Sequence, residues 1–232
     1  MQVISIKVKL VLLKNLEQAK SMRVVTDLID RVLCQGEKYQ QMHYERAYKP
    51  YNFSGLAKVE ADGVYKAEQI YSFTIRTIDF ELAKYLSNNM KNAENEFAKC
   101  FAVENWIVPK KHIEKLYSIT PFLLKSDAGY MRDAEPVVVI ENRLFLNLIK
   151  KYRFFSDEEV PNEDFVVWNE FRFLNQKPIR IPYKNDITLL GDKVELIIDS
   201  GSHAQNIAYM ILGVGFGENC SRGCGYMNVR FV

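Results

Sequence analysis

Residues 213–225 read Gly213-Val-Gly215-Phe-Gly217-Glu-Asn-Cys-Ser-Arg222-Gly223-Cys-Gly225 and hold five of the eleven glycines of this 232-residue chain. Four of them form a fixed pattern of Gly-x-Gly, five residues, and Gly-x-Gly again. Because glycine loses much conformational entropy on folding, such a cluster indicates a backbone with positive φ or a close approach by another group. Exposed backbone N–H groups can bind anions, and Arg222 lies within the segment. We therefore expect a loop that binds the backbone of a polyanion.

The elements expected around this loop argue against the common nucleotide-binding motifs. A helix is predicted to begin at Ser200 or Ser202 and to run into the loop, and residues 226–232 are predicted to form the final strand. Dinucleotide-binding loops have the reverse order, with a strand before the glycines and a helix after them. The phosphate-binding pattern Gly-x-x-x-x-Gly-Lys-Ser/Thr is also absent. We therefore expect no nucleotide cofactor. The alternative is a plain irregular connection, which rarely needs five glycines.

Alternating and helical patterns predict the fold of the first half of the chain. Ile4, Ile6, Val8 and Leu10 alternate with polar residues, which is typical of a half-buried strand. The further predicted elements are a helix over 17–34, a polar connection over 37–49, strands over 51–59 and 64–77 with a turn at Asp62-Gly63, a helix over 80–90 capped by Asp79, and a strand over 97–108. This β-α-β-β-α-β order is the ferredoxin-like pattern.

The second half repeats that order less clearly. The predicted elements are strands over 119–125 and 135–140, a helix over 142–152, strands over 164–172, 178–182 and 193–199, and then the last helix, the glycine loop and the final strand. We therefore predict an α+β protein of two tandem ferredoxin-like (βαββαβ) domains, with the glycine-rich loop 213–225 before the last strand. The predicted domains are 1–118 and 119–232, with the junction placed near residues 110–126.

The composition of the chain bears on its partners, on metal binding and on its cell compartment. The formal net charge is only +2, so charge alone does not establish binding to nucleic acid. Cys220 and Cys224 have no second cysteine pair, and the chain has three histidines, so we predict no structural zinc site and no bound metal. Few cysteines, no hydrophobic signal peptide and no apolar run of membrane-spanning length favour a cytoplasmic protein.

Together these features resemble the CRISPR-associated repeat-processing endoribonucleases of the repeat-associated RNA-binding (RAMP) superfamily. The glycine pattern at 215, 217, 223 and 225 matches the loop of that family. Lys49-Pro-Tyr-Asn-Phe-Ser54 resembles the family's strand after the first helix, and the segments around Ile75–Leu82 and Ile119–Pro121 also match. The resemblance covers essentially the full length. Cys224 is a less typical residue between the last two glycines.

The resemblance implies a function and a partner. Members of the family cleave CRISPR repeat RNA (pre-crRNA) into guide RNAs without a metal. The 2′-hydroxyl attacks the adjacent phosphate and leaves 2′,3′-cyclic phosphate and 5′-hydroxyl ends. The reaction needs a base, an acid and positive charge near the phosphorane. Whether proteins of a CRISPR effector complex also bind, and whether the chain is a monomer or a homodimer, stays open.

The resemblance also selects the candidate site residues. His43 occupies the place of the family's catalytic histidine, and an imidazole can act as base or acid near neutral pH. Lys49, six residues later, has the spacing of a catalytic lysine. The first helix has no tyrosine between 17 and 35, so Tyr39 is a candidate for the third catalytic group. The residues predicted to bind RNA are Lys38, Arg46, Lys110, Lys111, Gly215, Gly217, Arg222, Gly223 and Gly225.

Other interpretations remain open from the sequence. His43 would be an ordinary surface histidine if the resemblance did not hold, and the tyrosines near it would be packing or base-stacking residues. His112 suits contact with an RNA backbone, and His203 is a second candidate near the start of the last helix. The runner-up function is a non-catalytic RNA-binding RAMP subunit of a CRISPR effector complex. A protein-interaction scaffold without an RNA role is a third.

Overall fold

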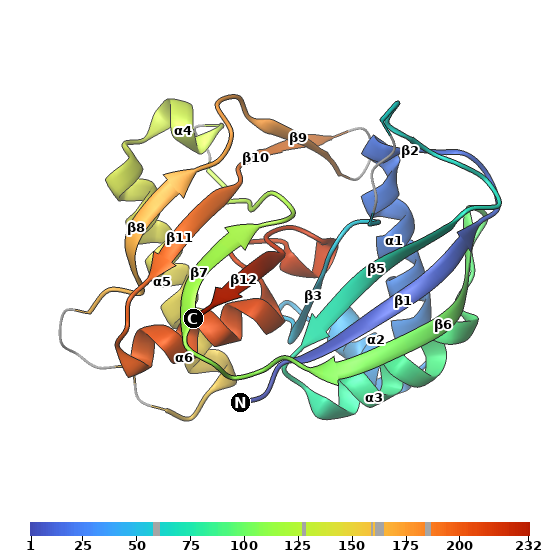
Figure 1. Cartoon of the computed structure of the whole chain (residues 1–232), viewed down its shortest axis with the longest axis horizontal. Helices are drawn as coiled ribbons and strands as arrows, with labels where there is room; N and C mark the ends of the chain where they lie inside the picture. Colours follow the sequence, from blue (N-terminus) through green and yellow to red (C-terminus); the bar gives the residue numbers. More distant parts are fainter. Residues whose placement is uncertain (58–60, 127–128, 159, 161–164, 184–186) are drawn as a thin grey trace.

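The computed structural model describes residues 1–57, 61–126, 129–158, 160, 165–183 and 187–232. The chain forms two α+β units, each built on a four-stranded antiparallel sheet, and the two units lie side by side (Figure 1). Within the described residues, no helix is long and apolar enough to cross a membrane.

The first unit has strands in the order β3-β5-β1-β6. Its main elements are β1 (Ile4–Leu12), α1 (Gln18–Leu33), β3 (Tyr51–Phe53), β5 (Ile70–Thr77), α3 (Phe80–Asn89) and β6 (Ala98–Ile107). Smaller elements are β2 (Leu16–Glu17), α2 (Glu37–Tyr44), β4 (Val64–Tyr65) and the single-turn helix η1 (Met90–Asn92). The central strand β1 pairs antiparallel with β5 and β6, which gives the ferredoxin-like arrangement.

The sequence patterns explain why this unit folds as it does. Alternation along β1 buries Ile6, Val8 and Leu10, and they join one core with the apolar face of α1. Helix α3 begins where predicted, because the Asp79 side chain accepts a hydrogen bond from the Leu82 N–H at 3.0 Å. The prediction of a β-α-β-β-α-β unit is therefore confirmed here.

The second unit has strands in the order β12-β7-β11-β8, which is the same ferredoxin-like arrangement. Its main elements are β7 (Ile113–Ser118), α5 (Val137–Phe155), β8 (Trp168–Phe173), β11 (Val194–Ile198), α6 (Ser202–Val214) and β12 (Met227–Phe231). Additional elements are α4 (Met131–Ala134), the hairpin strands β9 (Ile179–Pro182) and β10 (Thr188–Gly191), and the single-turn helix η2 (Cys220–Arg222) within the glycine loop. The fold class predicted from the sequence is confirmed.

Several predicted elements are wrong in detail. The first strand of the second unit is β7, and not residues 119–125, which follow it without forming a strand. The predicted strand 135–140 is the beginning of α5: Val137, Val138 and Val139 favour strands, but in the fold they form the first helical turn after Pro136. The segment 37–49 contains the unpredicted helix α2. Residues 58–59 and 164, at the ends of two predicted strands, lie outside the described residues.

The sheets also bear on the boundary between domains. β7 lies before residue 119, yet it pairs with β11 and β12 of the second sheet. A division between β6 and β7, at residues 108–112, follows the two sheets more closely than one at 118. We propose that boundary for the two domains.

The two units are joined through α6 and the strands beside it. Tyr209 of α6 donates a hydrogen bond to the Val108 carbonyl at 2.6 Å and accepts one from the Val3 N–H at 3.3 Å. The buried guanidinium of Arg76 on β5 donates to the Met227 carbonyl of β12 at 2.7 Å. These contacts hold α6 and β12, the two elements that flank the glycine loop, against the first unit.

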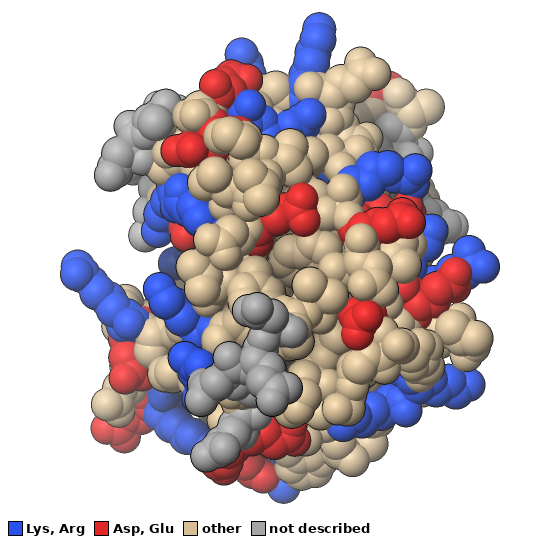
Figure 2. All heavy atoms as spheres, turned by 90° about the vertical axis from the view of Figure 1, so that its left-hand side faces the viewer, with Lys and Arg blue, Asp and Glu red and all other residues tan. Residues whose placement is uncertain are grey.

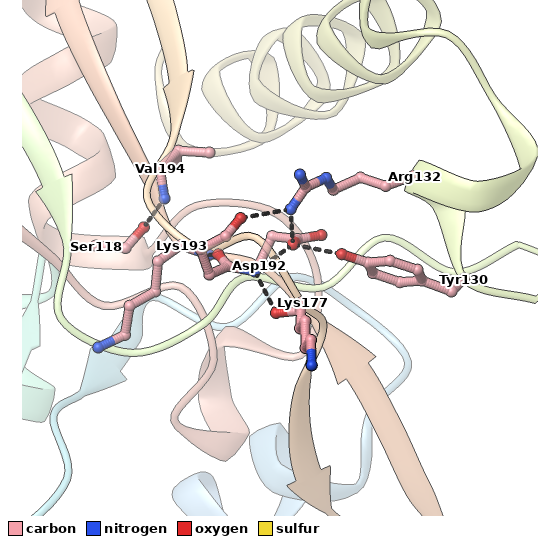
Figure 3. Close-up of polar contacts among 8 residues, drawn as sticks. Ser118, Tyr130, Arg132, Lys177, Asp192, Lys193 and Val194 are labelled. Atoms are coloured by element: carbon pink, nitrogen blue, oxygen red, sulfur yellow. Dashed lines mark hydrogen bonds and ion pairs between the residues drawn. The ribbon is translucent and has the colours of Figure 1, made fainter.

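A polar cluster holds the base of the β9–β10 hairpin. The buried carboxylate of Asp192 accepts hydrogen bonds from Tyr130 (2.5 Å), Arg132 (2.9 Å) and the Asn175 amide (2.7 Å) (Figure 3). Burial and the hydrogen bond to Asp192 raise the pKa of Tyr130. From this fixed base the hairpin extends across the top of the molecule toward α1 (Figure 1).

Candidate functional site

The four patterned glycines all have positive φ, as their spacing predicts. The φ values of Gly215, Gly217, Gly223 and Gly225 are 81°, 75°, 84° and 65°. A Cβ atom on Gly223 would lie 2.1 Å from Met22 Sδ, and one on Gly225 would lie 1.9 Å from the Phe216 carbonyl oxygen. The pattern therefore serves both a left-handed backbone and close packing.

The glycines themselves are buried, which differs from the exposed loop expected from the sequence. The N–H groups of Gly223 and Gly225 donate to the carbonyls of Cys220 and Pro121. The four glycines shape the loop, and their direct contact with RNA stays a prediction.

The loop packs on the other segment that carries the family resemblance. A Cβ on Gly215 would lie 3.0 Å from Asn52 Nδ2, and one on Gly223 would lie 2.9 Å from the Phe53 ring. Asn52 and Phe53 belong to β3, which follows Pro50. The two motifs lie far apart in the sequence, yet they form one packed unit between the domains.

A buried lysine supports the loop from the second unit. Lys151 of α5 is only 4% exposed, and its Nζ donates to the carbonyls of Gly215 (2.9 Å) and Gly217 (2.7 Å). Cys220 Sγ lies 3.4 Å from the same nitrogen. Three partners thus surround the ammonium group, as burial of a charged group requires. Lys151 was not a site residue in the sequence prediction.

His43 lies at the centre of the candidate site. Its Nδ1 is 3.4 Å from Asp30 Oδ1, and Arg222 Nη1 donates to Asp30 Oδ2 at 2.6 Å. Asp30 comes from α1, His43 from the last turn of α2, and Arg222 from the glycine loop. The His43 side chain is 14% exposed. The structure therefore brings His43 together with Arg222 through a carboxylate that the sequence prediction missed.

Asp30 carries no distinguishing motif in the sequence. It stands on the amphipathic helix α1, and an acidic residue on a helix usually lies on its solvated face. Only the tertiary approach of α2 and the glycine loop shows its place. Its position next to Nδ1 leaves Nε2 of His43 as the ring nitrogen available to a substrate.

Lys49 lies beside this cluster and turns toward α2. Its Nζ donates to the carbonyls of Met42 and Glu45, the latter at 2.7 Å. Burial lowers the pKa of Lys49; the carboxylate of Glu45 opposes this shift and the guanidinium of Arg222 adds to it. The positive charges of Lys49 and Arg222 are therefore close enough to affect each other.

Tyr39, the candidate third catalytic group, lies in a packing position. Its ring centroid is 4.2 Å from that of Tyr85 on α3, and the side chain is buried. Burial raises its pKa, and Asp79 and Glu81 add to the effect. Lys38 places its Nζ 5.5 Å from the Tyr39 ring. In the part of the chain that the structure describes, no side-chain hydrogen bond or ion pair joins either residue to His43 or Lys49.

A cavity adjoins the glycine loop on the side of the second unit. This loop cleft has a volume of about 630 Å³ and lies between the segment 46–49, α5 and residues 217–221. Its lining includes Arg46, Lys49, Lys125 and Lys151. Glu218 is the one carboxylate among the lining residues. The cleft is therefore a cationic hollow next to Lys49.

The remaining predicted residues lie elsewhere. Lys110 and Lys111 are exposed in the linker between β6 and β7, with Lys110 Nζ 5.9 Å from the Tyr209 ring. His112 is exposed in the same linker. His203 is the second residue of α6, so a whole helix separates it from the glycine loop. None of these residues lines the loop cleft or contacts His43 among the described contacts.

Charge is mixed on the surface of the second unit. Figure 2 shows Lys and Arg interspersed with Asp and Glu among uncharged side chains. The described residues form no large area of a single charge on this face. Among the described residues, no three histidine, cysteine or acidic side chains group closely enough to hold a metal ion.

Comparison of the whole chain with solved structures identifies the fold. A CRISPR-associated protein Cas6 and a RAMP protein described as binding different RNA substrates each superpose with a TM-score of 0.71 and 18% identity, over 98% of this chain and 99% of theirs. The chain has the fold of Cas6. A Cas6-related protein from Pyrococcus furiosus gives a TM-score of 0.66 at 14% identity, with 98% of each chain covered.

A further similar structure is a Cas6 product complex, with a TM-score of 0.61 and 16% identity over 99% of both chains. No protein-family model and no curated protein sequence matches this chain. The Cas6 fold is thus recognised through structural similarity at sequence identities of 14–18%.

Proposed function

We propose that this protein is an endoribonuclease that cleaves CRISPR repeat RNA without a metal ion. The observation that carries the proposal is the contact of His43 with Asp30, whose second carboxylate oxygen binds Arg222 and so links the candidate catalytic histidine to the glycine loop. The Cas6 fold supports it, because one similar structure is described as a Cas6 product complex. The repeat RNA is the proposed partner.

The proposed reaction divides among the residues of this site. His43 takes the proton of the 2′-hydroxyl through Nε2, and the 2′-oxygen attacks the adjacent phosphorus. The bond from phosphorus to the 5′-oxygen then breaks, and that oxygen takes a proton from water while the His43 imidazolium returns its proton to the solvent. The products are a 2′,3′-cyclic phosphate and a 5′-hydroxyl. Asp30 is a positioning residue, since a carboxylate at Nδ1 holds the ring and favours the imidazolium that forms.

The cations provide the charge that the transition state needs. Lys49 and Arg222 are the groups proposed to stabilise the phosphorane. In the structure without RNA, Lys49 bonds to the carbonyls of Met42 and Glu45, so it must turn from α2 to reach a phosphate. Arg46 and Lys125 of the loop cleft are proposed to bind neighbouring phosphates. Tyr39 is not assigned a step.

The position of Lys49 also favours a second candidate function. Lys49 binds carbonyls of α2 and its C-terminal end, and Tyr39 packs against Tyr85, so neither side chain is placed for catalysis in this structure. A non-catalytic RNA-binding RAMP subunit does not need either side chain to be free. Such a subunit would bind repeat RNA through the same loop and leave it intact.

A cleavage assay separates the two functions. Repeat RNA is incubated with the protein in EDTA, alongside RNAs that carry a single 2′-deoxy substitution at each position. The nuclease proposal predicts cleavage in EDTA that stops at one deoxy position. Binding without cleavage would support the non-catalytic subunit.

A further inference from the structure

A second cavity lies on the other side of Arg222, between the two units. This hairpin cleft has a volume of about 410 Å³ and is enclosed by α1, the β9 strand and the glycine loop. A volume of this size is in the range of small-molecule sites, which begin at about 300 Å³. Asp30 and Arg222 line it, so it adjoins the contact with His43.

The walls of the hairpin cleft suit a flat aromatic ligand. Tyr183 and Pro182 lie on the hairpin side, with Ile181, and Met22 lies on the side of α1. Unpaired RNA bases are commonly bound between such side chains, because every base has a face that can stack. The exposed Arg23 at the rim has no partner among the described residues and is free to bind a phosphate.

Two neighbouring acceptors on α1 give the cleft a chemical preference. Asp27 uses Oδ2 to accept hydrogen bonds from Arg31 Nε (2.8 Å) and Asn95 Nδ2 (3.0 Å), and within the described residues Oδ1 has no partner. Thr26 Oγ1 donates to the Met22 carbonyl at 2.8 Å, so its lone pairs can accept. The cleft is therefore lined by two acceptors from consecutive residues of α1.

We propose that the hairpin cleft binds one unpaired guanine of the RNA close to the cleaved phosphodiester. The inference rests on the proposed function, because it takes RNA as the substrate. Guanine presents two adjacent donors, N1–H and the N2 amino group, on its Watson–Crick edge. Adenine, cytosine and uracil each present one donor group there, beside acceptors. The pair Thr26 and Asp27 thus selects guanine, while Tyr183 and Met22 cover its faces.

The test replaces each guanosine of the repeat RNA in turn by inosine, which removes only the N2 amino group. Dissociation constants are measured with His43→Ala protein, so that the RNA stays intact. At one position near the cut we expect inosine to weaken binding about tenfold, the size of one good base contact. In Asp27→Asn, His43→Ala protein the same substitution should change binding by less than about threefold.

Two variants of the hairpin provide a matched comparison. Ile181→Ala removes part of the cleft wall and should weaken binding of the guanosine RNA. Ile187→Ala removes an exposed side chain of the same hairpin that does not line the cleft, so it should leave affinity and the inosine effect unchanged. Thermal unfolding of each variant shows whether the fold is intact.

The outcomes distinguish the two proposals. The guanine site is overturned if inosine weakens binding at no position of the RNA. It is also overturned if inosine weakens binding to Asp27→Asn, His43→Ala protein as strongly as binding to His43→Ala protein. If the protein cleaves the RNA but binding depends neither on the guanosine amino group nor on Asp27, the nuclease proposal is retained and the guanine site is not. An Asp27-dependent guanosine preference without cleavage would retain the guanine site and overturn the nuclease. Absence of RNA binding would overturn both.

Discussion

Gly225→Ala and Gly63→Ala separate two costs of placing a side chain at positive φ. The two glycines have φ values of 65° and 71°, so an alanine incurs a similar backbone penalty at either, about 1–2 kcal/mol. Their surroundings differ. A Cβ on Gly225 would lie 1.9 Å from the Phe216 carbonyl oxygen, whereas on Gly63 the nearest atom, Gln18 Oε1, is 4.0 Å away.

Relief of the overlap at Gly225 requires the backbone to move. The movement threatens two hydrogen bonds, from the Phe216 N–H to the Gly225 carbonyl (2.9 Å) and from the Gly225 N–H to the Pro121 carbonyl (2.8 Å). Each contributes about 0.5–1.5 kcal/mol. With overpacking of about 1–3 kcal/mol included, we expect Gly225→Ala to lower the free energy of unfolding by about 3–8 kcal/mol and Gly63→Ala by about 1–2 kcal/mol.

Urea unfolding followed by circular dichroism measures both values, and an unchanged m-value confirms that the same surface is exposed on unfolding. If the two variants lose the same stability within about 0.5 kcal/mol, the range of substitutions that have no specific structural cost, then the close packing of the glycine loop is not what requires Gly225. That result would refute the structural account of the motif.

Three further predictions concern the cations of the site. Lys151→Met leaves the Gly215 and Gly217 carbonyls without their donor, so urea unfolding should show a free energy of unfolding lower by about 2–5 kcal/mol. Lys151→Arg should lower it less. Equal stability of Lys151→Met and wild type would contradict this prediction. Because burial lowers the pKa of Lys49, its ammonium loses its proton at a lower pH than an ordinary lysine, so the cleavage rate should fall early as pH rises. Lys49→Arg stays charged and should extend the alkaline limb of the pH–rate profile; an identical limb would exclude Lys49 as the cation. Arg222→Ala should weaken RNA binding and reduce the slope of log affinity against log salt by about one, and an unaltered slope would show that Arg222 does not contact phosphate.

The sequence predicts the first unit well, because its signals are local. Alternation over Ile4–Leu10, the amphipathic helix and the Asp79 cap each act within a few residues, and the structure confirms them. The glycine spacing also predicts positive φ, since glycine adopts that backbone at the lowest cost of all residue types. It does not show that the loop is buried.

The second unit is predicted less well, because tertiary context overrides local preference there. Val137–Ile140 has strand-forming residues but forms the first turn of α5, where Ile140 packs into the core. β7 is short, and the stretch after it, 119–125, is just as apolar, so the period alone does not locate the strand.

Some residues of the candidate site are predicted from the sequence, and others are found only in the structure. His43 and Lys49 are identified by family position, and the structure places both beside Arg222. Asp30 and Lys151 come from helices whose sequences give no sign of a special role. Their roles depend on the approach of elements that lie far apart in the chain, and such approaches are visible only in the folded protein.

The central claim is that His43 performs RNA cleavage. Its most direct test is the single-turnover cleavage rate of repeat RNA in EDTA for wild-type and His43→Ala protein, with the dissociation constant of each measured on uncleavable 2′-deoxy RNA. The account predicts that His43→Ala abolishes cleavage and leaves binding within about threefold, because one contact is lost while Lys49, Arg222 and the other cations remain. Cleavage by His43→Ala at the wild-type rate would contradict it.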